Sequence, residues 1–442
     1  RTRRPPVTLR TSAPADLTTT APPPRRPANR RALILEAAAQ LFTARGFSGV
    51  SMGEIAAAVD VGPSALYRHF PGKDDLLAAA VDLALDLLTE ELDAAAEATG
   101  RAALLSGVAE FAVRHHTAPV LWAREARNLQ PDAYAVRSAR MDTLRVRFGH
   151  LVHDLPEDTE MSAAQQLSAR MTFAVLIDPA FHRPSLTPAR TVRVTIAAAA
   201  ALLDATVDAV SESPPTAYPR RLRRGTKREE ILGAALTIFT ERTYARTGME
   251  DVAAAVGLST SSLYNHFSSK AEILEVAMHR GNGYLQVTLD DILDAATDEG
   301  VALRELVDVY SHFALRHAGL VDALVTELRT LGSEAAPLIQ AQRDYLGEWV
   351  RLGTATAGAE RGGHDPAELR VLVQAIIGAI NEVARSHDPK DTADLRSAVS
   401  ALAAAGLGLH QRPAHTSRST PAASATTRDS VSKTIVARRS GV

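Results

Sequence analysis

One short phrase decides how this chain is organised: SALYRHF at residues 64–70 returns as SSLYNHF at residues 261–267. The match around the phrase runs without a gap, with residues 31–81 aligned on residues 228–278. Solenoid arrays need three or more shorter units. The chain is therefore predicted to consist of two homologous halves, and a structure for the first copy also applies to the second.

Apolar residues of the first copy recur with the period of an α-helix. Ile34 and Phe42 lie on one face of a predicted first helix. Gly46 follows that helix as a C-cap, because glycine tolerates left-handed dihedral angles. Ser51 stands three residues before Glu54, which is the capping-box pattern at the start of a helix. We therefore predict a second helix from this point.

A third, short helix is predicted to begin at Pro63, because proline is favoured at the first helical position. Leu66 and Phe70 lie four residues apart and would point inward together, and Lys73 opens a long fourth helix. Two short helices joined by a tight turn form a helix-turn-helix unit, whose second helix fits the DNA major groove. No convincing strand pattern appears, so the predicted fold class is all-α.

The repeated block resembles the DNA-binding domain of TetR/AcrR-type bacterial repressors, from Ile34 to Leu77 and again from Ile231 to Leu274. The motif LYxHFxxK is the most specific part of the resemblance and occurs in both copies. The resemblance implies two TetR-like units, each with a three-helix DNA-binding domain and a helical ligand-binding and dimerisation domain. It also implies a ligand-responsive regulator, most often a repressor released from its operator by a small apolar or amphipathic effector.

Composition divides the chain into seven segments. Pro, Thr and Arg dominate the first segment, Pro and Ser mark the connection between the halves, and the last segment lacks apolar periodicity. The expected domains are a disordered basic arm (1–28), a first helix-turn-helix domain (29–75), a first helical regulatory domain (76–210), a basic linker (211–225), a second helix-turn-helix domain (226–272), a second helical regulatory domain (273–410) and a disordered tail (411–442).

Basic residues gather in front of each DNA-binding unit. The formal net charge is only −2, so contact with a polyanion has to come from local patches. Residues 1–31 hold eight arginines against one aspartate, and residues 220–228 hold six basic residues and no acid. We expect both arms to contact phosphates with an affinity that falls as salt rises, rather than to be merely solvated.

The resemblance assigns DNA contacts position by position. Tyr67, Tyr264, Lys73 and Lys270 would contact phosphates, as would the residues at the start of each second helix. The short third helices would face base edges, with His69 and His266 near the DNA backbone. The predicted contacts are Ser51, Met52, Gly62, Pro63, Ser64, Ala65, Tyr67, Arg68, His69 and Lys73 in the first copy, and Gly248, Met249, Ser259, Thr260, Ser261, Ser262, Tyr264, Asn265, His266 and Lys270 in the second.

The second copy departs from the first at several of these positions. Thr243 stands where Gly46 stands, and Gly248 replaces Ser51, so a helix cap and a possible phosphate contact are lost. Members of this family are ordinarily homodimers that read palindromes with matched helices. Our hypothesis is an intramolecular pseudo-dimer that reads an asymmetric operator. Alternatively, only the first unit binds DNA and the second is a structural or protein-interaction module. Repressor and activator are both left open.

The family pairs the last two helices of each subunit as a four-helix bundle. The corresponding helices here are predicted at Ala163–Ile177 with Thr187–Val210, and at Pro366–Ser386 with Thr392–Leu409. Their Ala-rich faces allow close helix approach, which favours pairing between the halves. Internal core helices are the alternative reading, and a further pairing of full chains is left open.

Polar residues within apolar helical stretches are the candidates for an effector pocket. A fatty acyl thioester and a xenobiotic would both fit. Glu125 aligns with Glu327, and each stands two residues before an arginine, so acid and base do not share a helix face. The candidates are His115, His116, Trp122, Arg124 and Asn128 in the first half, and His312, His317, Glu327 and Trp349 in the second.

Several classes of function are excluded or disfavoured. The absence of cysteine excludes disulfides, thiolate catalysis and cysteine metal sites. No HExxH, GxSxG, Walker A or GxGxxG motif occurs, so we expect no enzyme, no metal site and no cofactor. The most apolar run, from Ile196, is interrupted by Asp204 and is too short to span a bilayer. We expect a cytoplasmic protein without a membrane partner.

Overall fold

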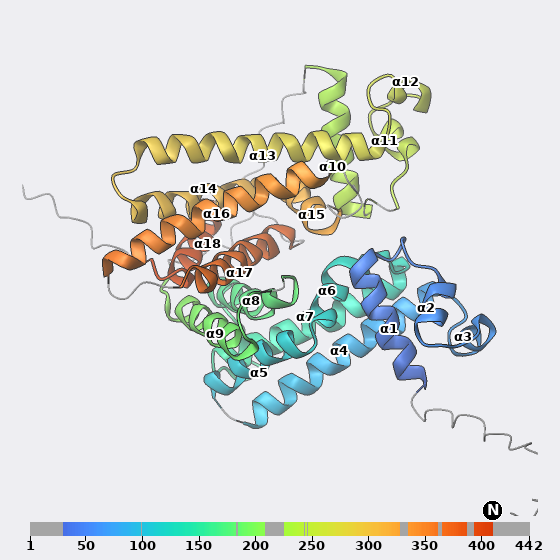
Figure 1. The fold of residues 1–442 in the computed structure, drawn as a ribbon, viewed down its shortest axis with the longest axis horizontal. Helices are drawn as coiled ribbons and strands as arrows, with labels where there is room; N and C mark the ends of the chain where they lie inside the picture. The colour runs from blue at the N-terminus through green and yellow to red at the C-terminus, as the bar shows by residue number, and fades with distance from the viewer. Residues whose placement is uncertain are drawn as a thin grey trace, which may run out of the picture. The chain divides into compact units, whose positions relative to one another are not determined.

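The computed structural model describes residues 30–98, 100–182, 184–207, 225–242, 244, 246–327, 335–360, 365–386 and 393–409. The predicted arm (1–28), the tail (411–442) and almost all of the predicted linker lie outside these residues, as does Thr243. Every regular element in the described ranges is helical, as the sequence predicted (Figure 1). None of the described helices is long and apolar enough to cross a bilayer.

The two halves contain corresponding helices in the same order. The first half consists of α1 (Arg30–Arg45), α2 (Met52–Ala58), α3 (Pro63–His69), α4 (Lys73–Glu97), α5 (Arg101–Arg114), α6 (Thr117–Val120), the π-helical turn η1 (Leu121–Glu125), the 3₁₀ turn η2 (Ala126–Asn128), α7 (Pro131–Val152), α8 (Ala163–Ile177), the 3₁₀ turn η3 (Asp178–Ala180) and α9 (Pro188–Asp204). The second half consists of α10 (Lys227–Arg242), α11 (Met249–Ala255), α12 (Thr260–Tyr264), α13 (Lys270–Ala295), α14 (Glu299–Arg316), α15 (Ala318–Glu327), α16 (Ala335–Glu360), α17 (Pro366–Arg385) and α18 (Ala393–Gly406).

Local signals define the first three-helix head, α1 to α3. Gly46 adopts a φ of 76°, which is the left-handed conformation expected of a helix C-cap. The capping box at the start of α2 is also confirmed, because the Glu54 amide donates to Ser51 Oγ at 3.3 Å and the Ser51 amide donates to Glu54 Oε2 at 2.8 Å. The Ser51 hydroxyl, which donates to Glu54 Oε2 at 2.7 Å, and the Ser51 amide hold the pKa of Glu54 low, at about 2, with help from Arg45.

The second head, α10 to α12, begins its helices with different groups. Gly248 has no side chain to cap α11, but its amide donates to Asp251 Oδ2 at 2.8 Å, so one arm of the capping box is kept. Ser259 caps α12, because its Oγ accepts a hydrogen bond from the Ser262 amide at 3.1 Å. The predicted loss of a helix cap is thus partly compensated by an acidic residue in the first turn.

Helices α8 and α9 of the first half pack against α17 and α18 of the second. At Gly378 of α17 the approach is so close that an added Cβ atom would overlap the buried carboxylate of Asp178. Gly406 of α18 lies equally tightly against Ile376 and near Leu202 of α9. Buried apolar residues of both halves form one continuous core here, whereas the second head has a core of its own. Glycine is needed at Gly378 because two helices meet there across a buried side chain.

Gly378→Ala should therefore destabilise the protein. We expect overpacking to cost about 1–3 kcal/mol, offset by at most about 1 kcal/mol of improved helix propensity. Gly283→Ala on α13 is the matched control, because no atom lies within 4 Å of its Cβ position. The control should raise the urea unfolding midpoint slightly, and Gly378→Ala should lower it. Equal midpoints for the two variants would contradict close packing at α17.

Candidate DNA-binding surfaces and effector cavity

Both recognition helices, α3 and α12, present polar residues outward from an apolar base. Leu66 and Phe70 are buried beneath α3, and Leu263 and Phe267 are buried beneath α12. Tyr67 and Tyr264 are each 52% exposed, in equivalent positions. Of the other predicted contacts, Ser51, Gly62, Pro63, Ser64, Arg68, His69, Ser259, Ser261 and Asn265 are exposed, and Ala65, Gly248, Thr260, Ser262 and His266 are half-buried.

At the start of each second helix, one predicted DNA contact has a buried side chain. Met52 and Met249 are only 8% and 7% exposed, and their side chains belong to the cores of the two heads. Each methionine is the first residue of its helix, where only the main-chain amides face outward. Both methionines anchor the helix start in the core, so a DNA contact at these positions would use the main-chain amide, and it stays a prediction.

Lys73 and Lys270 bind main-chain carbonyls within their own heads. Lys73 Nζ donates to the carbonyls of Phe47 and Val50 at 2.8 and 3.0 Å. In the same way, Lys270 Nζ donates to the carbonyl of Tyr244, at 2.7 Å, and to the carbonyl of Thr247. Each ammonium also lies over the ring of that aromatic residue, 4.2 Å from the Phe47 centroid. Both lysines thus fix the connection between the first two helices, and their phosphate contact stays a prediction.

A buried acid reaches the first head from the adjoining regulatory helix. Glu125, at the end of the π-helical turn η1, accepts a hydrogen bond from the Phe47 amide at 2.7 Å. Asn128 donates to the same carboxylate oxygen at 3.3 Å, so this candidate ligand residue supports Glu125 instead of lining a pocket. The sequence signal for this contact was the alignment of Glu125 with Glu327.

Glu327 takes the corresponding place in the second half, at the end of α15. Burial raises its pKa to about 7, and the nearby acids Asp322 and Glu125 add to the effect. Its negative charge acts in turn on Tyr244, whose pKa is raised to about 12 mainly by burial. The same charge raises the pKa of Lys270, although burial lowers that pKa more. Glu327, predicted as a ligand residue, therefore lies against the second head.

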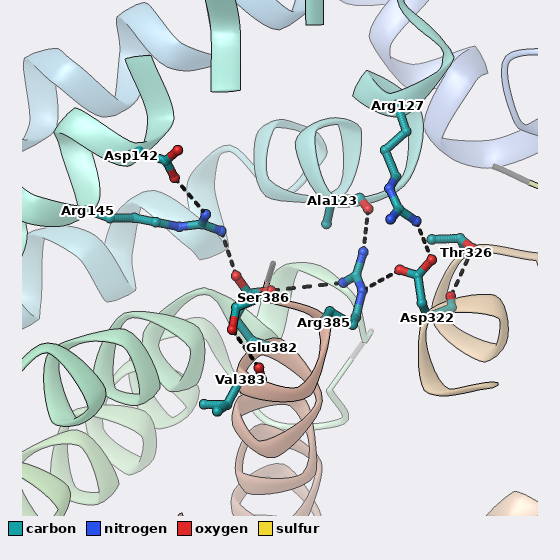
Figure 2. Close-up of polar contacts among 10 residues, drawn as sticks. All are labelled: Ala123, Arg127, Asp142, Arg145, Asp322, Thr326, Glu382, Val383, Arg385 and Ser386. Atoms are coloured by element: carbon teal, nitrogen blue, oxygen red, sulfur yellow. Dashed lines mark hydrogen bonds and ion pairs between the residues drawn. The ribbon is translucent and has the colours of Figure 1, made fainter. Parts of the chain in front are cut away.

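Figure 2 shows a buried ion-pair cluster that joins the two halves. Asp322 of α15 is 3% exposed and pairs with Arg127 of the first half. Arg385 of α17 binds the other oxygen of Asp322 at 2.8 Å and donates to the Ala123 carbonyl at 3.0 Å. The two arginines compensate the buried charge of Asp322, and Arg385 links the cluster to both halves.

A second set of contacts extends the cluster along α7. Arg145 pairs with Glu382 of α17 at 2.6 Å and with Asp142 of its own helix at 3.4 Å (Figure 2).

In the second head, Arg246 donates to the Asn128 carbonyl at 2.8 Å, across the boundary between the halves. The irregular segment α6–η1–η2 of the first half therefore contacts its own head through Glu125 and the other head through Asn128.

A cavity of about 1110 Å³ lies beside these contacts, and residues from α4 to α8 and from α13 to α17 line it. Trp122 and Arg124 are the two predicted ligand residues that border it. The other seven predicted ligand residues do not. The His115 ring lies tilted against Phe111, His312 contacts Arg396, and Trp349 is fully buried. His116, Asn128, His317 and Glu327 are also absent from its lining.

Sequence reasoning missed two residues at the first-half end of this cavity. Asp178 is buried, which raises its pKa, and it lies 3.7 Å from His182. Tyr134 stacks on Trp122 with 6.2 Å between ring centroids. The acid within the apolar stretch FAVLIDPAF, residues 173–181, was a usable signal for Asp178. Nothing in the local pattern of Tyr134 distinguishes it from a surface aromatic residue.

Comparison with known proteins gives the same result for both heads. The model of the bacterial regulatory proteins of the tetR family matches residues 34–80 and 231–277. The chain is 34% identical over 93 residues to the transcriptional activator FasR of Mycolicibacterium smegmatis, which covers 21% of this chain and 42% of FasR. It is 35% identical over 72 residues to the repressor KstR2 of the same organism, covering 16% of this chain and 35% of KstR2. The chain thus spans less than half the length of these two relatives.

A longer match is found with the transcriptional regulator LmrA of Bacillus subtilis. It is 30% identical over 132 residues, which covers 29% of this chain and 69% of LmrA. The solved structure of KstR2 from Mycobacterium tuberculosis is 21% identical and has a TM-score of 0.38, covering 42% of this chain and 95% of that one. From the two family matches and LmrA it follows that this chain belongs to the tetR family of bacterial regulatory proteins and carries the family's DNA-binding domain twice.

Proposed function

We propose that this chain is a ligand-responsive transcriptional regulator, most simply a repressor, whose two heads read an asymmetric operator as an intramolecular pseudo-dimer. The observation that carries the proposal is the presence of two different recognition helices in one chain whose regulatory helices pack together. Both heads match the family model, and the relatives include a transcriptional activator and a transcriptional repressor. We place its action in the cytoplasm, where a bacterial regulator meets the chromosome.

The two recognition helices offer different chemistry to the bases. Arg68 on α3 corresponds to Asn265, the residue directly after α12, and both are exposed. Arginine pairs best with guanine in the major groove, whereas asparagine pairs best with adenine. Pro63 likewise corresponds to Thr260, which adds a hydroxyl. Two heads with these side chains favour two unlike half-sites.

The irregular helix formed by α6, η1 and η2 provides a route from the cavity to the first head. Trp122 and Arg124 border the cavity, and the next residue, Glu125, holds the Phe47 amide. π-Helical turns are rare and occur frequently at functional sites. An effector that binds one arrangement of this helix better than another would shift the head with it. The effector is small and apolar or amphipathic, in keeping with the cavity lining.

A second candidate is that only the first head binds DNA. The observation in its favour is that Arg228, at the start of α10, is held within the second head. Its guanidinium donates to the His266 carbonyl and to Glu272, and it lies 3.9 Å from the centroid of the Phe267 ring. The second head would then be a structural or protein-interaction module.

Selection of bound sequences from a random double-stranded DNA library, with the purified full-length chain, tests the proposal. We expect two unlike half-sites about one helical turn apart. A palindrome would instead support pairing of two chains through like heads, with a structural second head. No enrichment even at low salt would contradict DNA binding by the ligand-free protein.

Tyr67→Phe and Tyr264→Phe should each weaken binding to the selected operator by about fivefold to tenfold, because each would remove one hydrogen bond to a phosphate worth about 1 kcal/mol. The loss should be similar for altered operators, since phosphate contacts carry no sequence information. Tyr284→Phe is the control, because Tyr284 is similarly exposed but lies on α13. Fluorescence anisotropy measures all three. If only Tyr67→Phe had an effect, the second candidate would be favoured.

Glu327→Gln should stabilise the protein increasingly as pH rises. The carboxyl has a pKa of about 7 in the folded chain against an ordinary value of 4.5. The folded state therefore keeps a proton that the unfolded state loses, so stability falls between about pH 4.5 and pH 7 and is level above this window. The variant lacks this loss, and its advantage should grow by up to about 3 kcal/mol.

Urea unfolding midpoints at pH 5, 6 and 8 measure this difference between the variant and the parent chain. Glu90→Gln, at an exposed position of α4, controls for the loss of one negative charge. A difference between Glu327→Gln and the parent that stays constant with pH would show that Glu327 is ionised throughout and that its burial has little effect.

A further inference from the structure

A short chain of hydrogen bonds runs from one head to the other through the turn η2. The Phe47 amide of the first head donates to Glu125 Oε2 at 2.7 Å, and Asn128 Nδ2 donates to the same oxygen at 3.3 Å. From the second head, Arg246 Nη2 donates to the Asn128 carbonyl at 2.8 Å. Phe47 and Arg246 both lie in the segment between the first two helices of their heads. Glu125 and Asn128 therefore bridge these two segments.

The middle of this bridge is anchored in the interior of the chain. Glu125 is only 7% exposed. Arg127 pairs with Asp322 of α15, whose side chain is 3% exposed. Leu129, the residue after η2, is buried in the core that both halves share. The carbonyl of Asn128 lies between these anchored residues, so it is an acceptor with a fixed position for a donor from the second head.

The two heads differ in how their cores join the rest of the chain. Phe42 of the first head belongs to the core that is continuous through both halves. Phe239 of the second head belongs to a separate core, which Ala323 of α15 and Leu338 of α16 complete. Within the described ranges, all buried apolar members of this separate core come from the second half. Polar contacts such as that of Arg246 therefore connect the second head to the first half.

The first copy of the repeat carries a different residue at the position of Arg246. The gap-free alignment places Gly49 opposite Arg246. A Cβ atom at Gly49 would lie 2.5 Å from the Arg45 carbonyl oxygen, so the first head has no room for a side chain there. Because the first head folds with glycine at this position, the fold of a head does not require the arginine. A symmetric dimer would make such a contact twice, whereas this chain makes it from one side.

We propose that Arg246 is a positioning residue, whose contact with Asn128 holds the second head at a fixed separation and orientation from the first and so selects the spacing between the two half-sites of the operator. The inference rests on the proposed reading of DNA by both heads and adds what determines the half-site spacing. Arg246 lies two residues before Gly248, the N-cap of α11. A contact that fixes Arg246 therefore also fixes the start of the second helix-turn-helix.

The first test measures the separation of the heads in the full chain without DNA. The chain contains no cysteine, so two introduced cysteines can be spin-labelled specifically. Gln40→Cys on α1 and Thr237→Cys on α10 are exposed and equivalent positions of the two heads. Pulsed electron paramagnetic resonance then gives the distribution of distances between the labels. We expect one narrow distribution, which Arg246→Ala broadens by about twofold because the second head loses a hydrogen bond to the first half.

Three further variants separate the contact from other effects of the substitution. Arg246→Lys should keep the distribution narrow, because an ammonium group also donates to a carbonyl. Arg242→Ala is the matched control, since Arg242 belongs to the same head but pairs with Asp251 inside it. Circular dichroism and thermal unfolding check the fold. Arg246→Met, which keeps the length without a donor, replaces Arg246→Ala if that variant fails this check.

The second test uses the selected operator with one base pair added or removed between its half-sites. The parent chain should bind each altered operator about tenfold more weakly, because one base pair both shifts and rotates a half-site. Arg246→Ala should reduce this penalty to about threefold or less, since its second head can follow the displaced half-site. Arg242→Ala should keep the full penalty of the parent chain.

An equal loss of affinity in Arg246→Ala at every spacing would show that Arg246 contacts a phosphate, and would overturn the positioning role. An unchanged distance distribution in Arg246→Ala would overturn the bridge between the heads. If the selection yields no operator, the proposed function fails, but the measurement without DNA still decides whether the bridge exists. Conversely, an operator with two unlike half-sites and an unchanged spacing penalty in Arg246→Ala contradicts only the positioning role.

Discussion

The buried carboxylate of Asp322 is the contact on which the arrangement of the two halves depends. An isolated charge in that position would be costly, because burial removes its water. Arg127 from one half and Arg385 from α17 offset this cost together, and Arg385 also binds the Ala123 carbonyl. Removal of one partner of such a buried group typically costs about 3–5 kcal/mol. The cluster therefore fixes α15 and α17 against the first regulatory helix and sets the wall of the cavity.

From this cluster, short connections lead to both heads. Arg127 lies two residues after Glu125, which holds the Phe47 amide, and Asp322 lies on the helix that ends at Glu327. Lys73 at the start of α4 and Lys270 at the start of α13 bind carbonyls in the segment between the first two helices of each head. Each head is therefore contacted by the long helix that follows it, α4 or α13, and by one short regulatory segment, η1 or α15. Few residues therefore separate the cavity lining from each head.

The halves have diverged where a symmetric dimer could not. In a homodimer each surface meets a copy of itself, so a change on one side is also made on the other. Here α6, η1 and η2 form an irregular helix, whereas the corresponding α15 is regular. The charged residues of the cavity lining come from the first half and α17, whereas α13 to α16 contribute only uncharged residues. Fusion in one chain permits this specialisation because each half has one fixed partner.

Sequence alone determined the helices of the heads and their repetition. The capping box of Ser51 and Glu54, the start of α3 at Pro63 and the inward pair Leu66 and Phe70 each depend on residues at most four positions apart, so the local pattern contains them. Repetition of the motif then identified the family. The start of α2 was predicted by the same local pattern.

Only the tertiary structure decided the partners of the charged and cavity residues. Lys73 binds carbonyls more than twenty residues away, and Arg127 pairs with Asp322 across the boundary between the halves. Trp122 and Arg124 were predicted at the cavity, but Asp178 and Tyr134 were not. Cavity lining depends on which faces of distant helices come together, and helical periodicity defines a face without naming its neighbour. The sequence therefore determined the two heads, and long-range packing decided how they are joined.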